Sequence, residues 1–373
     1  MNDPDRLAHV LSLPEAPVVA SLRDWEDLLS QARRATLSVR LARRLADTPG
    51  LQRVPVGPRH HLSSSLRVGE RVAQGMALEA ERVAHVLQLA GHRCVLLKGA
   101  AYLCAGLPPA RGRIFGDIDI LVPQHSLEAV EDALLGGGWI SSELDAYNQR
   151  YYRQWMHEIP PLTHVRRGST IDLHHTITPP TSVFCVDGAT LLSAMRPVDD
   201  KGLFWILQPV DMVLHSAVHL FAEGEFDRGL RDLLDMDDLL RHFEATEDGF
   251  WPDLVGRAKV LCLQVPLHHA LCHVERLFGP RVPTAQRDAV VALAPAWPKR
   301  QIMAWLLTLA LRPMHPSCDG RLTGFARWLL YVRSHWLRMP LRLLVPHLLR
   351  KSWIRRFPPK QQKPSPVAQA QNP

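Results

Sequence analysis

The sequence feature that most constrains the fold is an apolar run that contains two acids, DIDILV at residues 117–122. Its residue types favour a β-strand, in which alternate side chains share a face. Asp117 and Asp119 therefore point one way, and Ile118 and Ile120 point the other way. Two carboxylates held this close repel each other unless a cation lies between them. The run therefore predicts a strand whose acidic face has a cation as its partner.

Short strands and helices are predicted around this strand. CVLLKG (94–99) is typical of a buried strand that ends at a glycine turn, and a short helix follows over 100–107. SLEAVEDALLGGG (126–138) predicts a helix that ends at a triple glycine. HEIPPLTHV, RRGS and TIDLHHT (157–176) predict a strand, a turn and a second strand. The pattern indicates a mixed α/β core at residues 92–178.

Helical periodicity dominates on both sides of this core. DWEDLLSQARRATLSVRLARRLAD has apolar residues at helical spacing, with Asp24 as a plausible cap, and a second helix is expected over about 62–91. After Pro179 and Pro180 helical patterns return and continue to about residue 356. The final stretch, 357–373, is rich in Pro and Gln and predicts disorder.

These patterns predict an α+β fold, a small mixed-sheet core between an N-terminal helical segment and a larger C-terminal helical domain. The expected boundaries are residues 1–91 for the N-terminal helical region, 92–178 for the α/β core, 181–356 for the helical domain and 357–373 for the tail.

Composition excludes several classes of protein. With 46% apolar and 22% charged residues, the chain is an ordinary globular protein. It has no uncharged apolar run of 18 residues, so no transmembrane segment is expected, and its start, MNDPDRLAHV, does not resemble a signal peptide. The six cysteines include no CxxC pair, which argues against a zinc ribbon and favours a reducing compartment. We therefore expect a cytoplasmic protein.

Basic charge is concentrated near the C-terminus. From Ala296 onward the chain has 14 Lys and Arg against one acid, whereas the first 295 residues have 30 against 36. This basic C-terminal region mixes Arg with Trp and Leu, which leaves three readings open. It is a packed helix with a solvated basic face, or it lies peripherally on an anionic membrane surface, or it binds an anionic partner such as RNA.

Three acids in or near apolar strands predict a metal site. Asp172 lies in the strand TIDLHHT and joins Asp117 and Asp119 as an acid whose burial is costly unless it is paired or metal-bound. Three converging carboxylates suit Mg²⁺, with Mn²⁺ as the alternative, because both prefer oxygen ligands. A two-metal site of this kind polarises a phosphate and stabilises the attacking and leaving oxygens. Asp172 is also well placed to take the proton of an attacking hydroxyl.

The order of glycine turn, helix, Asp-x-Asp strand and distal aspartate resembles the nucleotidyltransferase fold of the DNA polymerase beta superfamily. More narrowly, LLKGAAYLCAGLPPARGRIFGDIDILV is similar to a bacterial family of uncharacterised nucleotidyltransferases. Those proteins have a Lys-Gly turn, an arginine shortly before Asp-x-Asp and a later Asp-Leu-His, which correspond here to Lys98–Gly99, Arg113 and Asp172–His174. The helical stretch LHSAVHLF…LRDLLDMDDLL is also similar, with Asp235 at the family's helical aspartate. The resemblance covers about residues 60–245.

One motif departs from the wider superfamily, whose turn is usually Gly-Ser or Gly-Gly with a serine hydroxyl on the nucleotide phosphates. Here the turn is Lys98–Gly99–Ala100 and has no hydroxyl. The resemblance implies that Lys98 and the backbone N–H groups at Gly99 bind the phosphates, helped by the positive end of the following helix. Arg113 either neutralises the acids or grips the triphosphate through its guanidinium.

Several histidines are open to two readings. His174 and His175 face opposite ways on a strand, so one of them could approach the site while the other packs. His215 and His219 share a helix face and could bind a metal with Asp232 or Asp235, but a buried hydrogen-bonded network is favoured because no HExxH-type motif surrounds them. The group His268, His269, Cys272 and His273 is interpreted as core or surface.

The resemblance implies a Mg²⁺-dependent enzyme that moves a nucleoside monophosphate from an NTP to an acceptor hydroxyl or, less favoured, an amine. The acceptor is a small molecule, a peptide or RNA. Two alternatives stay open: a catalytically inactive nucleotide-binding or regulatory protein, and a toxin-type nucleotidyltransferase that modifies tRNA or protein. Asp117, Asp119 and Asp172 are the expected catalytic and metal-binding residues, and Lys98, Gly99 and Arg113 the expected nucleotide-binding residues.

Overall fold

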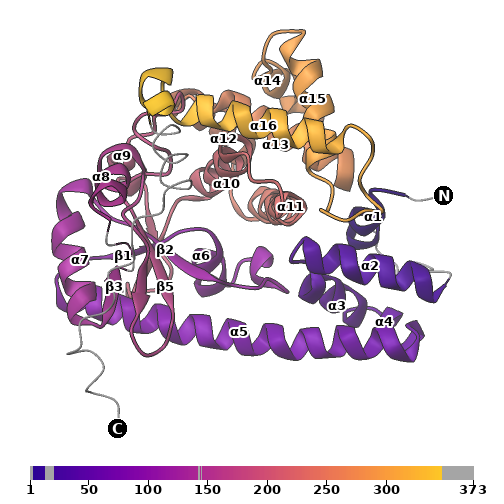
Figure 1. The fold of residues 1–373 in the computed structure, drawn as a ribbon, viewed down its shortest axis with the longest axis horizontal. Helices are drawn as coiled ribbons and strands as arrows, with labels where there is room; N and C mark the ends of the chain where they lie inside the picture. Colours follow the sequence, from indigo (N-terminus) through magenta and orange to yellow (C-terminus); the bar gives the residue numbers. More distant parts are fainter. Residues whose placement is uncertain (1–2, 13–20, 142, 144, 347–373) are drawn as a thin grey trace.

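The structure is a computed structural model that describes residues 3–12, 21–141, 143 and 145–346 (Figure 1). Its centre is a seven-stranded mixed sheet in the order β3-β4-β5-β2-β1-β7-β6. The strands are β1 (Cys94–Leu96), β2 (Asp117–Leu121), β3 (Trp139–Ser141), β4 (Leu162–His164), β5 (Thr170–His174), β6 (Arg196–Pro197) and β7 (Phe204–Ile206). The expected strands of the core, including the strand, turn and strand over 157–176, are confirmed as β1, β2, β4 and β5.

The register of the central strands brings the acids together. β2 pairs parallel with β5 and antiparallel with β1, and Asp119 lies directly opposite Asp172. Ile118 and Ile120 of β2 are fully buried on the other face of the sheet. Because neighbouring strands lie about 4.8 Å apart, this register places the carboxylates of Asp119 and Asp172 side by side on one face.

The N-terminal segment is helical, as expected, but its helices differ from the expected ones. They are α1 (Arg6–Ser12), α2 (Leu22–Arg34), α3 (Ser38–Ala46), α4 (Gly50–Arg53) and the long α5 (Val56–Leu89), which runs along one side of the molecule (Figure 1). The single helix expected over 24–47 is wrong, because Thr36 adopts a left-handed conformation with φ 57° and ends α2. α5 begins six residues before the expected position, because Pro58 lies in its first turn, where no N–H is required.

The remaining helices cover the sheet and form the larger helical part. They are α6 (Lys98–Cys104), α7 (Leu127–Gly136), α8 (Ala146–Trp155), α9 (Gly188–Leu192), α10 (Pro209–Glu223), α11 (Gly229–Thr246), α12 (Phe250–Val260), α13 (Gln264–Phe278), α14 (Arg287–Val291), α15 (Lys299–Ala310) and α16 (Thr323–Arg338), with 3-10 turns at Pro108–Ala110, Gln124–Ser126 and Thr284–Gln286. The expectation that residues after Pro180 are helical throughout is wrong for 196–206, since apolar β7 pairs in parallel with β1 and extends the sheet.

The two helical parts contact each other. α1 packs on α13, and Arg276 forms an ion pair with Asp5 at 2.9 Å. The Gln31 side-chain amide of α2 donates to the Ser317 hydroxyl at 2.8 Å. Segments from opposite ends of the sequence therefore lie side by side and enclose the α/β core between them (Figure 1).

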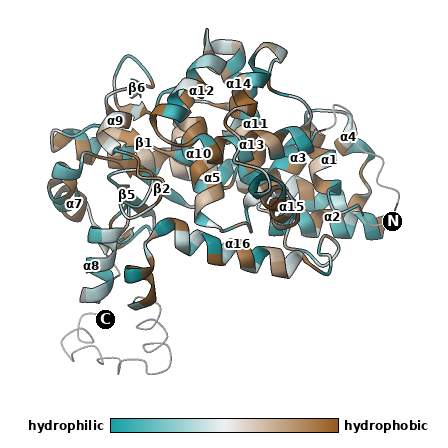
Figure 2. Ribbon diagram, turned by 90° about the horizontal axis from the view of Figure 1, so that it is seen from above, coloured by the Kyte–Doolittle hydropathy of each residue, from teal (hydrophilic) through white to brown (hydrophobic). Residues whose placement is uncertain are grey.

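The basic C-terminal region packs onto the fold as far as it is described. Leu307 and Leu330 are buried, and Arg333 and Arg338 donate to backbone carbonyls of α10 at 2.8 Å. Hydrophobic and hydrophilic residues alternate along α16 (Figure 2), and its Trp328 is 57% exposed. The rest of that region and the predicted tail, 347–373, lie outside the described residues. No helix of the described part of the chain is long and apolar enough to cross a membrane.

Candidate functional site

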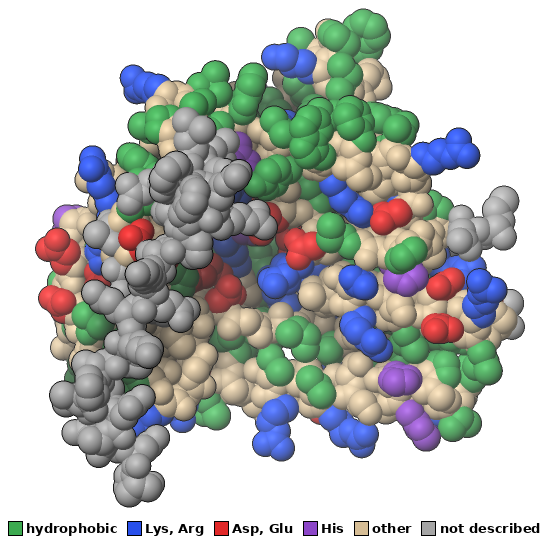
Figure 3. All heavy atoms as spheres, viewed as in Figure 1, with side chains coloured by type: hydrophobic (Ala, Val, Ile, Leu, Met, Phe, Trp, Pro, Cys, Tyr) green, Lys and Arg blue, Asp and Glu red, His purple; other side chains and the backbone are tan. Residues whose placement is uncertain are grey.

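A cavity of about 480 Å³ opens beside the acidic face of β2 and β5. Acidic side chains gather in a hollow on this face of the molecule (Figure 3). All six of the expected site residues line the cavity; they are Lys98, Gly99, Arg113, Asp117, Asp119 and Asp172. Helices α8, α10, α11 and α16 supply the facing walls, so residues far apart in the sequence form one site.

The three aspartates differ in their surroundings. Asp117 is exposed at the start of β2, whereas Asp119 is buried. Asp172 has a buried carboxylate oxygen, Oδ1, for which the described residues provide no hydrogen-bond partner. Burial, followed by the charges of Asp119 and Glu158, raises the pKa of Asp172 to about 7. This side chain therefore lacks a positive partner of its own.

Lys98 is the positive partner of Asp119. Its Nζ lies 3.4 Å from Asp119 Oδ1, and the backbone N–H of Leu97 donates to the Asp119 carbonyl at 2.9 Å. Burial alone would raise the pKa of Asp119, but Lys98 and His174 lower it well below its usual range. Lys98 has φ 43°, a left-handed conformation that costs about 1–3 kcal/mol in a residue with a side chain. This backbone turn aims the lysine at the cavity at the end of β1.

Arg113 is fixed by contacts on the other side of the cavity. It forms an ion pair with Asp235 of α11, and its guanidinium lies 5.7 Å from the centre of the Tyr102 ring. A Cβ at Gly99 would lie 3.1 Å from Arg113 Nε and 3.3 Å from Phe115, so the glycine leaves room for this arginine. Arg113 therefore balances the charge of Asp235 on α11 and not the charges of Asp117 and Asp119 on β2. It still lines the cavity.

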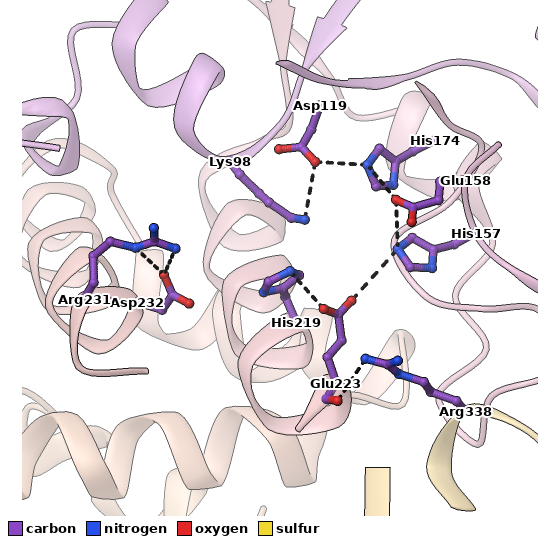
Figure 4. Close-up of polar contacts among 10 residues, drawn as sticks. All are labelled: Lys98, Asp119, His157, Glu158, His174, His219, Glu223, Arg231, Asp232 and Arg338. Carbon is purple, nitrogen blue, oxygen red and sulfur yellow. Dashed lines mark hydrogen bonds and ion pairs between the residues drawn. The ribbon is translucent and has the colours of Figure 1, made fainter. Parts of the chain in front are cut away.

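Histidines and glutamates gather beside Lys98 and Asp119 (Figure 4), and His157, Glu158, His219 and Glu223 line the cavity. His174 Nε2 lies 3.1 Å from Asp119 Oδ1 and 3.5 Å from Glu158 Oε2. His157 Nε2 lies 3.8 Å from the same Glu158 oxygen and 3.9 Å from Glu223 Oε1. Sequence reasoning did not select His157, Glu158 or Glu223. The adjacent His and Glu of HEIPP were the available signal, but their position was interpreted only as a strand.

Of the histidines that the sequence left open, some reach the site and others pack in the interior. His174 reaches the site, whereas His175 Nε2 lies 3.1 Å from the carbonyl of Met156. His219 lies 3.0 Å from Glu223 in the cavity wall. His268, His269 and His273 are buried in α13, consistent with the core interpretation.

Arginines lie on the wall that faces the strand acids, together with acids of the same segments. Arg228 just before α11, Arg231 of α11 and Arg338 of α16 line the cavity, and Arg231 pairs with Asp232 at 2.6 Å. The Arg338 guanidinium donates to the Glu223 carbonyl at 2.8 Å (Figure 4). Strand carboxylates on one wall and guanidinium groups on the facing wall, where acids also lie, suit a ligand with an anionic chain that binds through a divalent cation.

Comparisons with known proteins agree with this geometry. A family model described as "Uncharacterised nucleotidyltransferase" matches residues 21–279. That range includes β1 to β7, all three strand aspartates and helices α10 and α11. No curated protein and no solved structure matched the chain.

Proposed function

The chain belongs to the uncharacterised nucleotidyltransferase family and is a transferase, and we propose that it moves a nucleoside monophosphate from an NTP to an acceptor hydroxyl with the help of Mg²⁺. The observation that carries the proposal is the register that sets Asp119 against Asp172, with Asp117 on the same face. An amine acceptor is the less favoured form of the same reaction.

The donor set fits Mg²⁺, or Mn²⁺, which takes the same oxygen ligands. Asp117, Asp119 and Asp172 would hold the ion. The Oδ1 atom of Asp172 is buried and has no hydrogen-bond partner among the described residues, so it is free to bind a cation. When bound, the metal supplies charge stabilisation at the reacting phosphate.

The remaining side chains bind and orient the NTP. A cavity of about 480 Å³ lies in the usual size range for a nucleotide-sized ligand. Lys98, Arg228 and Arg231 supply positive charge for the triphosphate, and Arg113 is held close to Gly99 at the same wall. Asp172 accepts the proton of the acceptor hydroxyl, because a base beside the metal ligands can reach the attacking oxygen.

The test uses the full-length protein with Mg²⁺, each of the four NTPs labelled at the α-phosphate, and protein, RNA and small-molecule fractions of a cell extract as acceptors. We expect label to appear in one fraction with wild type and not with Asp117→Asn. A parallel reaction uses NTPs labelled at the γ-phosphate, and label that reaches an acceptor from these instead would contradict nucleotidyl transfer. Tight Mg²⁺–NTP binding with no transfer to any fraction would favour the inactive, regulatory alternative. A labelled tRNA or protein would favour the toxin-type alternative.

A further inference from the structure

We propose that His157, Glu158 and His174 bind a borderline transition-metal ion such as Zn²⁺ or Co²⁺, in a site distinct from the carboxylate set for Mg²⁺. The three residues lie at the β5 end of the cavity (Figure 4). The site does not depend on the proposed nucleotidyl transfer, because its argument uses only the geometry and chemistry of these side chains.

The ligand atoms are spaced for a shared cation. One nitrogen or oxygen of each side chain lies within 4.8 Å of the other two. Glu158 Oε2 is 3.5 Å from His174 Nε2 and 3.8 Å from His157 Nε2. Tetrahedral zinc with bonds of about 2.0–2.1 Å sets its ligand atoms roughly 3.3 Å apart. The Glu158 oxygen is therefore within about half an ångström of this spacing from each histidine nitrogen, and the two histidine nitrogens lie no more than 4.8 Å apart.

His174 Nε2 is held by Asp119 Oδ1 at 3.1 Å, but hydrogen bonding does not account for the approach of Glu158 to the two histidines. Contacts of 3.5 and 3.8 Å are longer than the usual range for N–H···O bonds. The Nδ1 atoms of His157 and His174 are buried without a hydrogen-bond partner in the part of the chain that the structure describes, so each ring is oriented through its Nε2 contacts.

The backbone holds the ligands in place. Glu158 and His174 form an antiparallel bridge. On either side of it, the N–H of Ile159 donates to the Leu173 carbonyl at 3.0 Å, and the N–H of His175 donates to the His157 carbonyl at 2.9 Å. A site built on paired backbone segments needs little rearrangement to bind an ion, which favours binding over a chance arrangement of surface side chains.

Ligand chemistry separates this site from the aspartates. Imidazole nitrogens favour Zn²⁺ and Co²⁺, whereas Mg²⁺ prefers oxygen ligands. Two histidines and one glutamate with an open position are a common catalytic zinc set. Glu223 Oε1, at 3.9 Å from His157 Nε2, is available as a fourth ligand from α10. Binding at His174 Nε2 would displace the proton it shares with Asp119, which couples the two sites.

The test titrates metal-free, full-length protein with Co²⁺ in excess Mg²⁺ and follows the visible d–d absorption of cobalt. We expect a band that saturates at one equivalent. His157→Gln and Glu158→Gln should each weaken binding by at least about tenfold. Asp117→Asn removes a strand carboxylate outside the set and should keep the band.

Circular dichroism checks that each variant is folded. If His157→Gln does not fold, the cobalt affinity of Glu158→Gln alone tests the site. Three results would overturn the proposal: no saturable band in wild type, unchanged affinity in folded Glu158→Gln, or displacement of Co²⁺ by Mg²⁺, which would assign the ion to the aspartates. Absence of NTP transfer by the wild-type protein, with an intact cobalt band, would contradict the proposed function and leave this site standing.

Discussion

Two groups of carboxylates in this molecule differ in how their charge is balanced. Asp237 and Asp238 of α11 face a second cavity of about 230 Å³ lined by six arginines. Asp237 pairs with Arg281 and Arg241, and Asp238 pairs with Arg40 and again with Arg241. These carboxylates have their countercharges within the chain.

The strand aspartates have only part of the countercharge that they need. Asp119 has Lys98 and His174, but among the described residues no cationic side chain forms an ion pair with Asp117 or Asp172. Whether a carboxylate has a countercharge within the chain therefore separates structural acids from functional ones. An acid that is balanced by arginines holds the fold together, whereas an unbalanced group of acids in a cavity is arranged for a ligand that brings its own positive charge.

The largest expected effect is on catalysis at the exposed strand acid. Asp117→Asn should lower transfer by about a thousandfold, because losing a metal ligand removes several kcal/mol of charge stabilisation. The melting temperature of the metal-free protein should not change, since Asp117 is exposed. Initial rates with labelled NTP measure the loss. An initial rate for Asp117→Asn within tenfold of the wild-type rate would show that Asp117 is not one of the metal ligands.

Asp172→Asn should separate rate from binding. We expect transfer to fall by about a hundredfold or more, as for loss of a general base, with NTP affinity within a few-fold of wild type. The metal-free variant should be at least as stable as wild type, because the change removes a carboxylate that sits near Asp119 and Glu158 without a countercharge. Single-turnover kinetics and thermal melting measure both. Unfolding of the variant at neutral pH would show that Asp172 is structural.

Asp238→Asn should show the opposite pattern. It leaves Arg40 without its partner in a buried cluster, so we expect a loss of about 3 kcal/mol in the free energy of unfolding. The affinity for Mg²⁺–NTP should stay as in wild type. Urea unfolding and calorimetry measure the two quantities, with Asp117→Asn as the matched aspartate control. A stable Asp238→Asn variant with weakened NTP binding would reverse the assignment of the two groups.

A smaller, pH-dependent effect is expected at Glu79 of α5. Its carboxylate accepts hydrogen bonds from Arg167, Arg82 and Ser169. Burial raises the pKa of Glu79, but these three partners outweigh it and lower the pKa to about 2. A pKa below the unfolded value stabilises the fold above about pH 4.5, and this contribution is lost as the pH falls to about 2.

Glu79→Gln should therefore destabilise the protein by about 1–2 kcal/mol at pH 7, and the two proteins should converge in stability as the pH approaches 2. Urea unfolding across this pH range measures the difference. If the difference in the free energy of unfolding between the two proteins stays constant down to pH 2, the effect of the substitution comes from packing and not from the charge.

The strands and the identity of the acids follow from sequence because both are local properties. Alternation places Asp117 and Asp119 on one face, and TIDLHHT identifies β5. The pairing of Asp119 with Asp172 is not local, since it depends on which strands are neighbours in the sheet. The approach of His157 and Glu158 to His174 depends on a different pairing, the antiparallel bridge between Glu158 and His174, whose register the predicted strand, turn and strand left open.

Local propensity also failed where tertiary contacts decide. Phe204–Ile206 form a strand of only three residues, too short for a clear alternating pattern, and pair with β1 through the fold. Thr36 adopts a left-handed conformation that its residue type does not favour. The partner of Arg113 could not be derived either, because Asp235 lies on a helix more than a hundred residues away.

The central claim is that the unbalanced strand acids bind an NTP through a divalent cation, and isothermal titration calorimetry tests it most directly. Each NTP is titrated into full-length wild type and Asp117→Asn, once with Mg²⁺ and once with EDTA. We predict that wild type binds an NTP with Mg²⁺ and loses that binding in EDTA, and that Asp117→Asn shows no dependence on the metal. Equal NTP affinity of wild type in Mg²⁺ and in EDTA would contradict the account.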